Sequence, residues 1–443
     1  MEQYLIECEG EGLRSDACAV LPYSKSICNR VLTIRALSWM KDGQLDAAWC
    51  ERLRLGQEAV GPQSDGICDD TRAMLDWLVR ADRLDGQTLD IGAAGTAMRF
   101  STALLSMLRT DCVLTGSARM KERPIGLLVD ALRCLGADIQ YTEREGFPPL
   151  RIRGGAMRGG AVTLAGNVSS QFISALLMVG PMLEEGLRLR LEGEIISRPY
   201  IDMTLREMQT AGAQAAWTTE RDITVEPVPY LQSRTTFIER DWTAASYWYE
   251  VLALGGREGS TLTLQGLLEE STQGDRRVAD IFGHLGVQTT FVPDEAKTVV
   301  LTKRGTPDER LDWDFVETPD LAQTVVVTCC LLGVPFHFTG LQSLRIKETD
   351  RIAALQNELR KLGFSIEADD RQMWWTGTAE SQIAQQTAAI DTYKDHRMAM
   401  AFAPAALRCG GIVINDPLVV SKSYPAFWQE LRQTGLNLTE RRS

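Results

Sequence analysis

The feature of this sequence that most constrains its fold is a repeated pattern: an amphipathic helix, a glycine near its end, then a short apolar strand. Four copies are clear, at residues 127–141, 205–217, 278–291 and 352–368, and weaker ones lie at 72–91 and 427–439. Apolar residues recur in them at three- and four-residue spacing, as on the buried face of a helix. The pattern predicts a chain built from helix–strand units.

A glycine follows the helix in five of these copies, at Gly136, Gly212, Gly286, Gly363 and Gly435. Helices often end on a residue with positive φ, a conformation that glycine adopts without steric cost. We therefore expect positive φ at these glycines.

The spacing of the glycines indicates how the units assemble. Successive glycines lie about 75 residues apart, which is too long for a solenoid repeat and suits a packed supersecondary unit. The 443 residues also exceed the roughly 250–300 at which one hydrophobic core stops growing. We predict two domains of about three units each, with a boundary near 235–241, where a strand-like stretch leads into a helix at 243–254. The pattern alone also fits an ordinary α/β protein.

Composition excludes several functional classes. The formal net charge of −12 argues against a nucleic-acid partner, and no apolar run approaches the ~18 residues of a membrane span. The start, Met1-Glu2-Gln3, does not look like a signal peptide, so we expect a cytoplasmic protein.

The metal-binding and redox residues are scattered. The ten cysteines show no Cys-x-x-Cys spacing, and the three histidines, at 284, 337 and 396, lie far apart. Free buried thiols and no metal or cofactor are the expectation.

Basic and small polar residues gather at predicted turns before helices, where free backbone N–H groups favour an anion. Five such turns are 24–30 (SKSICNR), 92–99 (GAAGTAMR), 168–171 (VSSQ), 345–351 (RIKETDR) and 393–398 (YKDHRM), and Lys422 follows in 417–425. Ser26 and Arg30 are four apart on one predicted helix face, as are Lys347 and Arg351, with Glu348 between them in sequence. Helices are predicted at 172–183 and 399–407.

Each turn also has a purely structural interpretation. The serines at 169 and 170 suit a helix N-cap, and the charges at 347–351 suit a solvated salt-bridge network. Repeated in both halves of an acidic chain, however, the turns indicate a cleft that concentrates positive potential on small, multiply charged substrates.

These residues carry a resemblance to a known family. The segments are SKSICNR (24–30), AAGTAMR (93–99), RMKERPIGLLVDALRCLGA (119–137), SSQF (169–172), SRPYIDMT (197–204), PDLAQT (319–324), RIKETDRI (345–352) and YKDHRMAMAFAPAAL (393–407). They resemble the 3-phosphoshikimate 1-carboxyvinyltransferases, or EPSP synthases, of the enolpyruvyl transferase family, nearly end to end.

The resemblance implies an α/β fold of two domains, each with three βαβαββ units around an inward-facing helix bundle, an inside-out α/β barrel. One domain would comprise 1–20 and 240–443 and carry the acid–base carboxylates and part of the phosphoenolpyruvate site. The other, 21–239, would carry most of the shikimate 3-phosphate site, with the active site in the cleft between them.

The implied reaction is attack of the 5-hydroxyl of shikimate 3-phosphate on phosphoenolpyruvate. A tetrahedral ketal phosphate forms and loses phosphate to give 5-enolpyruvylshikimate 3-phosphate, a step of aromatic amino-acid biosynthesis. The resemblance implies small-molecule substrates, shikimate 3-phosphate and phosphoenolpyruvate. We further expect no cofactor, no metal, no nucleic-acid or membrane partner, and a monomer.

The resemblance also assigns site residues. Those for shikimate 3-phosphate are Lys25, Ser26, Arg30, Ser169, Ser170, Gln171, Ser197, Tyr200, Asp320 and Lys347. Those for phosphoenolpyruvate are Lys25, Gly95, Arg123, Gln171, Arg351, Arg397 and Lys422. Lys25, Asp320, Glu348 and Lys422 are the implied catalytic residues, with Asp320 as the base for the hydroxyl, Glu348 in proton transfer at the methylene carbon and Lys422 as another candidate acid.

Two positions depart from the family pattern. Ala93 stands where many relatives carry Asn, and Ser343 replaces the usual Asn ahead of 345–348. Two alternatives remain: the sister transferase acting on UDP-N-acetylglucosamine, whose catalytic Cys position is here Ala118, and a non-catalytic anion-binding protein of the same fold.

Overall fold

The computed structural model describes residues 2–8, 13–14, 17–55, 67–232, 237–377 and 387–442. The chain forms two compact units. The terminal unit contains Met1–Pro22 and Glu239–Ser443, and the central unit contains Tyr23–Ile238. Each has its own hydrophobic core.

The terminal unit contains three four-stranded sheets. Their orders are β14-β15-β13-β2, β16-β17-β19-β18 and β20-β21-β1-β22. The strands are β1 (Glu2–Cys8), β2 (Ala17–Ala19), β13 (Thr261–Leu264), β14 (Val287–Phe291), β15 (Val299–Lys303), β16 (Leu311–Asp314), β17 (Phe336–Thr339), β18 (Glu367–Ala368), β19 (Met373–Trp375), β20 (Ala388–Ile390), β21 (Gly411–Asn415) and β22 (Leu436–Arg442).

The central unit contains two four-stranded sheets, ordered β5-β6-β8-β7 and β11-β12-β10-β9, and a two-stranded hairpin, β3–β4. The strands are β3 (Met40–Lys41), β4 (Gln44–Leu45), β5 (Thr88–Asp90), β6 (Asp111–Thr115), β7 (Asp138–Tyr141), β8 (Leu150–Arg153), β9 (Gly160–Ala165), β10 (Leu187–Glu192), β11 (Ala215–Trp217) and β12 (Asp222–Val225). In the described part of the chain, the third repeat of this unit is therefore shorter than the predicted one.

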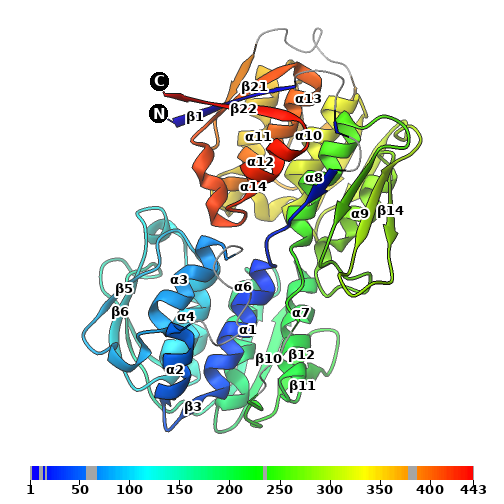
Figure 1. Cartoon of the computed structure of the whole chain (residues 1–443). Coiled ribbons are helices and arrows are strands. Elements are labelled where there is room, and N and C mark those ends of the chain that lie inside the picture. The colour runs from blue at the N-terminus through cyan, green and yellow to red at the C-terminus, as the bar shows by residue number, and fades with distance from the viewer. Residues whose placement is uncertain are drawn as a thin grey trace. The chain divides into compact units, whose positions relative to one another are not determined.

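All five four-stranded sheets share one pairing pattern. Each has one parallel pair, such as β5–β6 or β16–β17, and two antiparallel pairs. A parallel pair needs a crossover connection, usually a helix, whereas antiparallel neighbours need none. The N-terminal strand β1 pairs with both β21 and β22, so the start of the chain completes its last sheet (Figure 1).

Helices with apolar residues on every side form the interior of each unit. In the central unit α4 is buried along its whole length and packs on α1 and α6; in the terminal unit α8, α10 and α12 pack on one another (Figure 1). The helices are α1 (Lys25–Ser38), α2 (Ala47–Arg54), α3 (Asp69–Leu78), α4 (Gly95–Met107), α5 (Gly126–Cys134), α6 (Ser170–Val179), α7 (Arg198–Thr210), α8 (Trp242–Gly255), α9 (Val278–Gly283), α10 (Ala322–Leu332), α11 (Arg351–Lys361), α12 (His396–Phe402), α13 (Ala406–Cys409) and α14 (Phe427–Gln433).

The predicted helix–glycine–strand units are confirmed. The helices α5, α7, α9, α11 and α14 each lead into a strand, and the five intervening glycines have φ between +79° and +107°. The weaker copy at 72–91 also forms helix and strand, as α3 and β5.

Several boundaries differ from the prediction. The described part of 235–241 forms no strand beyond an isolated bridge at Arg240, and residues 235 and 236 lie outside the described residues. Two buried helices begin earlier than expected, α6 at Ser170 and α12 at His396. All ten cysteines are free, and six are buried. Within the described ranges, no helix is long and apolar enough to cross a bilayer.

Candidate functional site

Asp320 is the centre of a charged cluster in the terminal unit. It lies in the 3-10 segment η5 (Pro319–Leu321), immediately before the buried helix α10. Its two oxygens accept hydrogen bonds from Arg351 Nη1 at 2.9 Å and Arg397 Nη2 at 2.8 Å. Lys347 Nζ is 3.7 Å from Oδ1. Three cations, two of them four residues apart in sequence and the third on α12, therefore converge on one carboxylate.

Glu348 forms the second carboxylate of this cluster. It accepts from Arg351 Nη2 at 3.0 Å and from Lys422 Nζ at 2.6 Å. Lys422 ends the 3-10 segment η8 (Pro417–Lys422), just before α14. Arg351 thus bridges Asp320 and Glu348, the two carboxylates that the sequence singled out.

Asp395 is the carboxylate that sequence reasoning missed. It is fully buried, accepts from Arg351 Nε at 2.7 Å, and caps α12 by accepting from the backbone N–H of Arg397 at 3.0 Å. It therefore orients Arg351 and fixes the start of the helix that carries Arg397. The sequence signal was an Asp at a helix start, which is the usual N-cap position.

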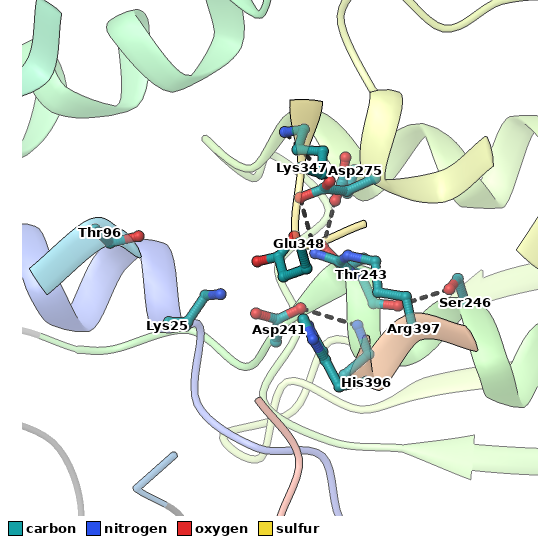
Figure 2. Close-up of polar contacts among 12 residues, drawn as sticks. Lys25, Thr96, Asp241, Thr243, Ser246, Asp275, Lys347, Glu348, His396 and Arg397 are labelled. Carbon is teal, nitrogen blue, oxygen red and sulfur yellow. Dashed lines mark hydrogen bonds and ion pairs between the residues drawn. The ribbon is translucent and has the colours of Figure 1, made fainter. Parts of the chain in front are cut away.

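We call these seven residues the Asp320 cluster: Asp320, Lys347, Glu348, Arg351, Asp395, Arg397 and Lys422. Figure 2 shows Lys347, Glu348 and Arg397 among the neighbouring polar side chains. The cluster has four cations against three carboxylates, so with every group ionised it keeps one net positive charge for an anionic ligand.

The cations reverse the effect of burial on Asp320. Burial alone raises the pKa of a carboxyl group, but Arg397, Lys347 and Arg351 hold the pKa of Asp320 well below its usual value. Burial lowers the pKa of Lys347, although Asp320 opposes this. Asp320 is therefore firmly ionised while these cations face it.

The prediction that Lys347 and Arg351 lie on one face of a helix is wrong. Helix α11 begins at Arg351, and Asp350 caps it by accepting from the N–H of Ala353. Lys347 lies before the helix in extended conformation, outside the 3-10 segment η6 (Gln342–Ile346). Lys347 and Arg351 meet because both contact Asp320, so tertiary structure and not helical spacing brings them together.

In the central unit, Lys25 begins helix α1 and pairs with a buried partner. Its Nζ lies 3.2 Å from the Oδ2 of Asp70, which is in the first turn of α3. Sequence reasoning missed Asp70, because the two residues are 45 positions apart and nothing in the local pattern links them.

Arg30 lies fully buried one turn after Ser26, as the predicted spacing requires. It donates to the hydroxyls of Thr204 and Ser174 and to the backbone carbonyls of Ser26 and Tyr200, at 2.7–3.1 Å. All these acceptors are neutral, and burial lowers the pKa of Arg30 to about 10.

The turn at 168–171 serves in part as a helix cap. Ser169 is the N-cap of α6 and accepts from the N–H of Gln171 at 3.4 Å. The Gln171 amide donates to Thr96 Oγ1 at 3.1 Å, at the start of α4. Ser170 is the first residue of α6. At the start of α7, Ser197 is the N-cap, with φ of 55°, and the carbonyl of Tyr200 accepts from Arg30.

Gly95 and Arg123 lie in contact in the central unit. A β-carbon on Gly95 would stand 2.6 Å from Arg123 Nη1. The buried Arg99 donates hydrogen bonds to the backbone carbonyls of Gly95 and Pro124, both at 3.2 Å. Arg99 therefore ties the Gly95 turn to the Arg123 segment, a role that the sequence motif did not reveal.

Three further residues noted in the sequence, His396, Ala93 and Ser343, lie in different surroundings. His396 is buried, with its ring 3.6 Å from the Asp395 carboxylate. Ala93 is exposed, and the buried Ser343 hydroxyl has no hydrogen-bond partner among the described residues. In those residues no group of His, Cys, Asp and Glu has the arrangement of a metal site.

Comparisons with known proteins identify the family of the chain. Residues 72–431 match the family described as EPSP synthase (3-phosphoshikimate 1-carboxyvinyltransferase). A 3-phosphoshikimate 1-carboxyvinyltransferase of Bacteroides fragilis is 51% identical over 420 residues, which cover 94% of this chain and 95% of the relative. One of Salmonella newport is 37% identical over 423 residues, which cover 94% and 96%.

Solved structures match the fold across the whole chain. The EPSP synthase of Acinetobacter baumannii aligns with a TM-score of 0.74 at 21% identity, covering 100% of both chains. The enolpyruvyl transferase NikO of Streptomyces tendae aligns with a TM-score of 0.63 at 13% identity, covering 100% of this chain and 99% of that one. The predicted α/β enolpyruvyl transferase fold is confirmed. The chain therefore belongs to the EPSP synthase family, and its activity is that of a 3-phosphoshikimate 1-carboxyvinyltransferase.

Proposed function

We propose that both units supply residues to this one transfer, an enolpyruvyl transfer from phosphoenolpyruvate to the 5-hydroxyl of shikimate 3-phosphate in the shikimate pathway. The observation that carries the assignment is the convergence of Arg351, Arg397 and Lys347 on Asp320. A carboxylate held among cations suits a base that works beside an anionic substrate.

The terminal unit supplies the acid–base groups and part of the phosphoenolpyruvate site. Arg351, Arg397 and Lys422 bind the carboxylate and phosphate of phosphoenolpyruvate, and Lys347 with Asp320 contacts shikimate 3-phosphate. Preorganised cations of this kind stabilise the negative charge that develops on the reacting groups, and one such donor typically contributes ~3–4 kcal/mol.

The central unit supplies most of the shikimate 3-phosphate site. The residues are Lys25, Ser26, Arg30, Ser169, Ser170, Gln171, Ser197 and Tyr200. Gly95, Arg123, Lys25 and Gln171 add contacts to phosphoenolpyruvate. The support is chemical. A buried guanidinium at Arg30 that donates to the neutral acceptors described above, hydroxyls at a helix start, and an arginine against the first residue of α4 all favour anionic oxygens.

Substrate binding prepares Asp320 to act as the base. In the free protein, its cations hold the pKa of Asp320 well below the usual value, which makes Asp320 a poor proton acceptor. When Arg351 and Arg397 turn to a bound anion, the pKa of Asp320 rises and the carboxylate can accept the proton of the 5-hydroxyl.

Glu348 and Lys422 handle the proton at the methylene carbon. Their side chains share a hydrogen bond of 2.6 Å, so a proton donated by one can be replaced through the other. Protonation of the methylene carbon with attack of the hydroxyl gives the tetrahedral ketal phosphate. Its collapse releases phosphate and returns the proton from the methyl group to the protein.

Phosphate release tests the proposal. The purified protein is incubated with phosphoenolpyruvate and, in separate reactions, shikimate 3-phosphate or UDP-N-acetylglucosamine. We expect release with shikimate 3-phosphate alone. Release with the nucleotide sugar would contradict the acceptor assignment, and release in neither reaction would leave an anion-binding protein.

We further propose that the protein works as a monomer in the cytoplasm. Analytical ultracentrifugation at assay concentration tests the first part, with sedimentation of a 49.1 kDa particle as the expected result. A dimer that persists on dilution would contradict it.

A further inference from the structure

Asp275 is a buried carboxyl group that the reaction scheme above does not use. It lies in the 3-10 segment η4 (Gly274–Arg277), before α9, and only 3% of the residue is exposed. One of its oxygens, Oδ2, accepts a hydrogen bond from the Thr243 hydroxyl on α8 (Figure 2). The other, Oδ1, is buried and has no hydrogen-bond partner among the described residues.

Helix α8 connects this carboxyl group with the Asp320 cluster. Thr243 and Tyr247 are four residues apart and so lie on one face of α8. Thr243 holds Asp275, and the Tyr247 hydroxyl accepts from Arg397 Nη1 at 3.4 Å. The same helix packs against η4, η5 and α12, the segments that carry Asp275, Asp320 and Arg397.

The charges that act most on the pKa of Asp275 come from η5, from α12 and from the start of α8. Asp320 on η5 and Arg397 on α12 act on it electrostatically, and Asp241, the N-cap of α8, adds a further negative charge. The two arginines of its own segment are engaged elsewhere, Arg276 with Asp280 and Arg277 with Glu317. Arg397 therefore binds Asp320 directly and also acts electrostatically on Asp275.

Burial and, next, the negative charge of Asp320 together raise the pKa of Asp275 to about 7, against the opposing effects of Thr243 and Arg397. Near neutral pH the carboxyl group therefore titrates between its neutral and charged forms. In the charged form it adds a fourth carboxylate against the four cations of the Asp320 cluster, and the net positive charge is lost.

We propose that Asp275 is a positioning residue of the Asp320 cluster: held by Thr243 beside Asp320 and Arg397, it sets the net charge that the cluster presents to phosphoenolpyruvate. This inference rests on the roles proposed for Asp320 and Arg397. Neutral Asp275 leaves Arg397 to the substrate anion, and ionised Asp275 competes with that anion for Arg397.

The test compares the pH dependence of the KM for phosphoenolpyruvate in the wild type and in Asp275→Asn, at saturating shikimate 3-phosphate. Asparagine keeps the size of the side chain and an oxygen for the Thr243 hydroxyl, and it stays neutral. We expect the wild-type KM to rise roughly tenfold between about pH 6 and about pH 8.5, which bracket the pKa of about 7. In Asp275→Asn this rise should be absent, with kcat nearly unchanged.

The matched control is Asp280→Asn, the same substitution five positions further on at an exposed carboxylate paired with Arg276. It should follow the wild-type profile. A purely structural role for Asp275 would instead alter KM and kcat by the same factor at every pH. A rise of KM in Asp275→Asn parallel to that of the wild type would overturn the proposal.

A second measurement does not depend on the reaction. Difference infrared spectra of the free proteins, wild type minus Asp275→Asn, should show a protonated-carboxyl C=O band in acid that disappears with a midpoint near pH 7. Absence of this band would refute the inference. Its presence in a protein without transferase activity would show that the proposed function, and not the titration of Asp275, had failed.

Discussion

The guanidinium of Arg123 lies so close to Gly95 that a β-carbon on this glycine would stand 2.6 Å from Nη1. Real β-carbons do not approach a neighbouring atom this closely, so any larger residue at position 95 must displace the arginine. Gly95 is also the first residue of α4, where backbone N–H groups are free to bind an anion. The contact thus places a cation at a helix N-terminus.

Gly95→Ala should weaken phosphoenolpyruvate binding without harming the fold. The methyl group pushes Arg123 away, so we expect the KM for phosphoenolpyruvate to rise roughly tenfold or more, the loss of about one charge-assisted hydrogen bond. Alanine favours a helix more than glycine does, so the melting temperature should stay equal or rise. Steady-state kinetics and thermal melting measure both effects.

The control is Gly155→Ala in the same unit. A β-carbon there meets nothing within 4 Å, so kinetics and stability should match the wild type. An unchanged KM for phosphoenolpyruvate in Gly95→Ala would contradict the role assigned to Arg123.

Asp70→Asn should disturb the position of the Lys25 side chain and so lower the activity. The pair is 3.2 Å apart with Asp70 almost fully buried, so the substitution leaves Lys25 without its charged partner. We expect kcat/KM for both substrates to fall by roughly 10- to 100-fold, the range in which a misplaced catalytic group lowers rates. Asp76→Asn, an exposed position on the same helix α3, is the matched control and should be silent. Equal kinetics in the two variants would show that Asp70 does not position Lys25.

Stability should depend on pH through Asp275. Its pKa is raised from 3.8 to about 7 in the folded protein, so the folded state binds its proton more tightly than the unfolded chain does. The stability linked to that proton is complete below about pH 3.8 and is lost as pH rises toward 7. Asp275→Asn is free of this loss.

The free energy of unfolding of Asp275→Asn minus that of the wild type should therefore increase between about pH 3.8 and about pH 7 and stay constant above pH 7. The total increase should be at most about 4 kcal/mol. Denaturant unfolding at a series of pH values measures the difference. Curves for the two proteins that stay parallel across this range would contradict it.

Local chemistry explains which structural predictions succeeded. Gly136 or Gly363 reveals a helix end because only glycine adopts positive φ without steric cost. The prediction that Lys347 and Arg351 share a helix face failed because Asp350 caps the helix, which begins only at Arg351. The four-residue spacing of the two charges suggested a helix face, and the capping signal at Asp350 was overlooked. Among the described residues, β3 and β4 form only a two-stranded hairpin, and the helix–glycine–strand pattern has no copy there that could have predicted it.

The candidate site residues also differ in whether a local sequence motif contains them. Asp320, Glu348 and the arginines stand in motifs, and family resemblance identifies them. Asp70, Asp395 and Asp275 act through partners 32 to 45 positions away, Lys25, Arg351 and Thr243, so that only the folded chain shows these pairings. The N-cap position of Asp395 could be predicted locally, but no local pattern indicates which distant side chain each of these carboxylates contacts.

The most direct test of the account is Asp320→Asn, measured for turnover and for binding separately. Single-turnover kinetics with saturating shikimate 3-phosphate give the rate, and calorimetric titration with phosphoenolpyruvate gives its Kd. Because the base is lost while Arg351 and Arg397 are released from Asp320, we predict a rate lower by roughly 10²- to 10⁴-fold and a Kd that is equal or smaller. Near-normal turnover, or a rate that falls only in proportion to weaker binding, would contradict the role of Asp320 as the base held among cations.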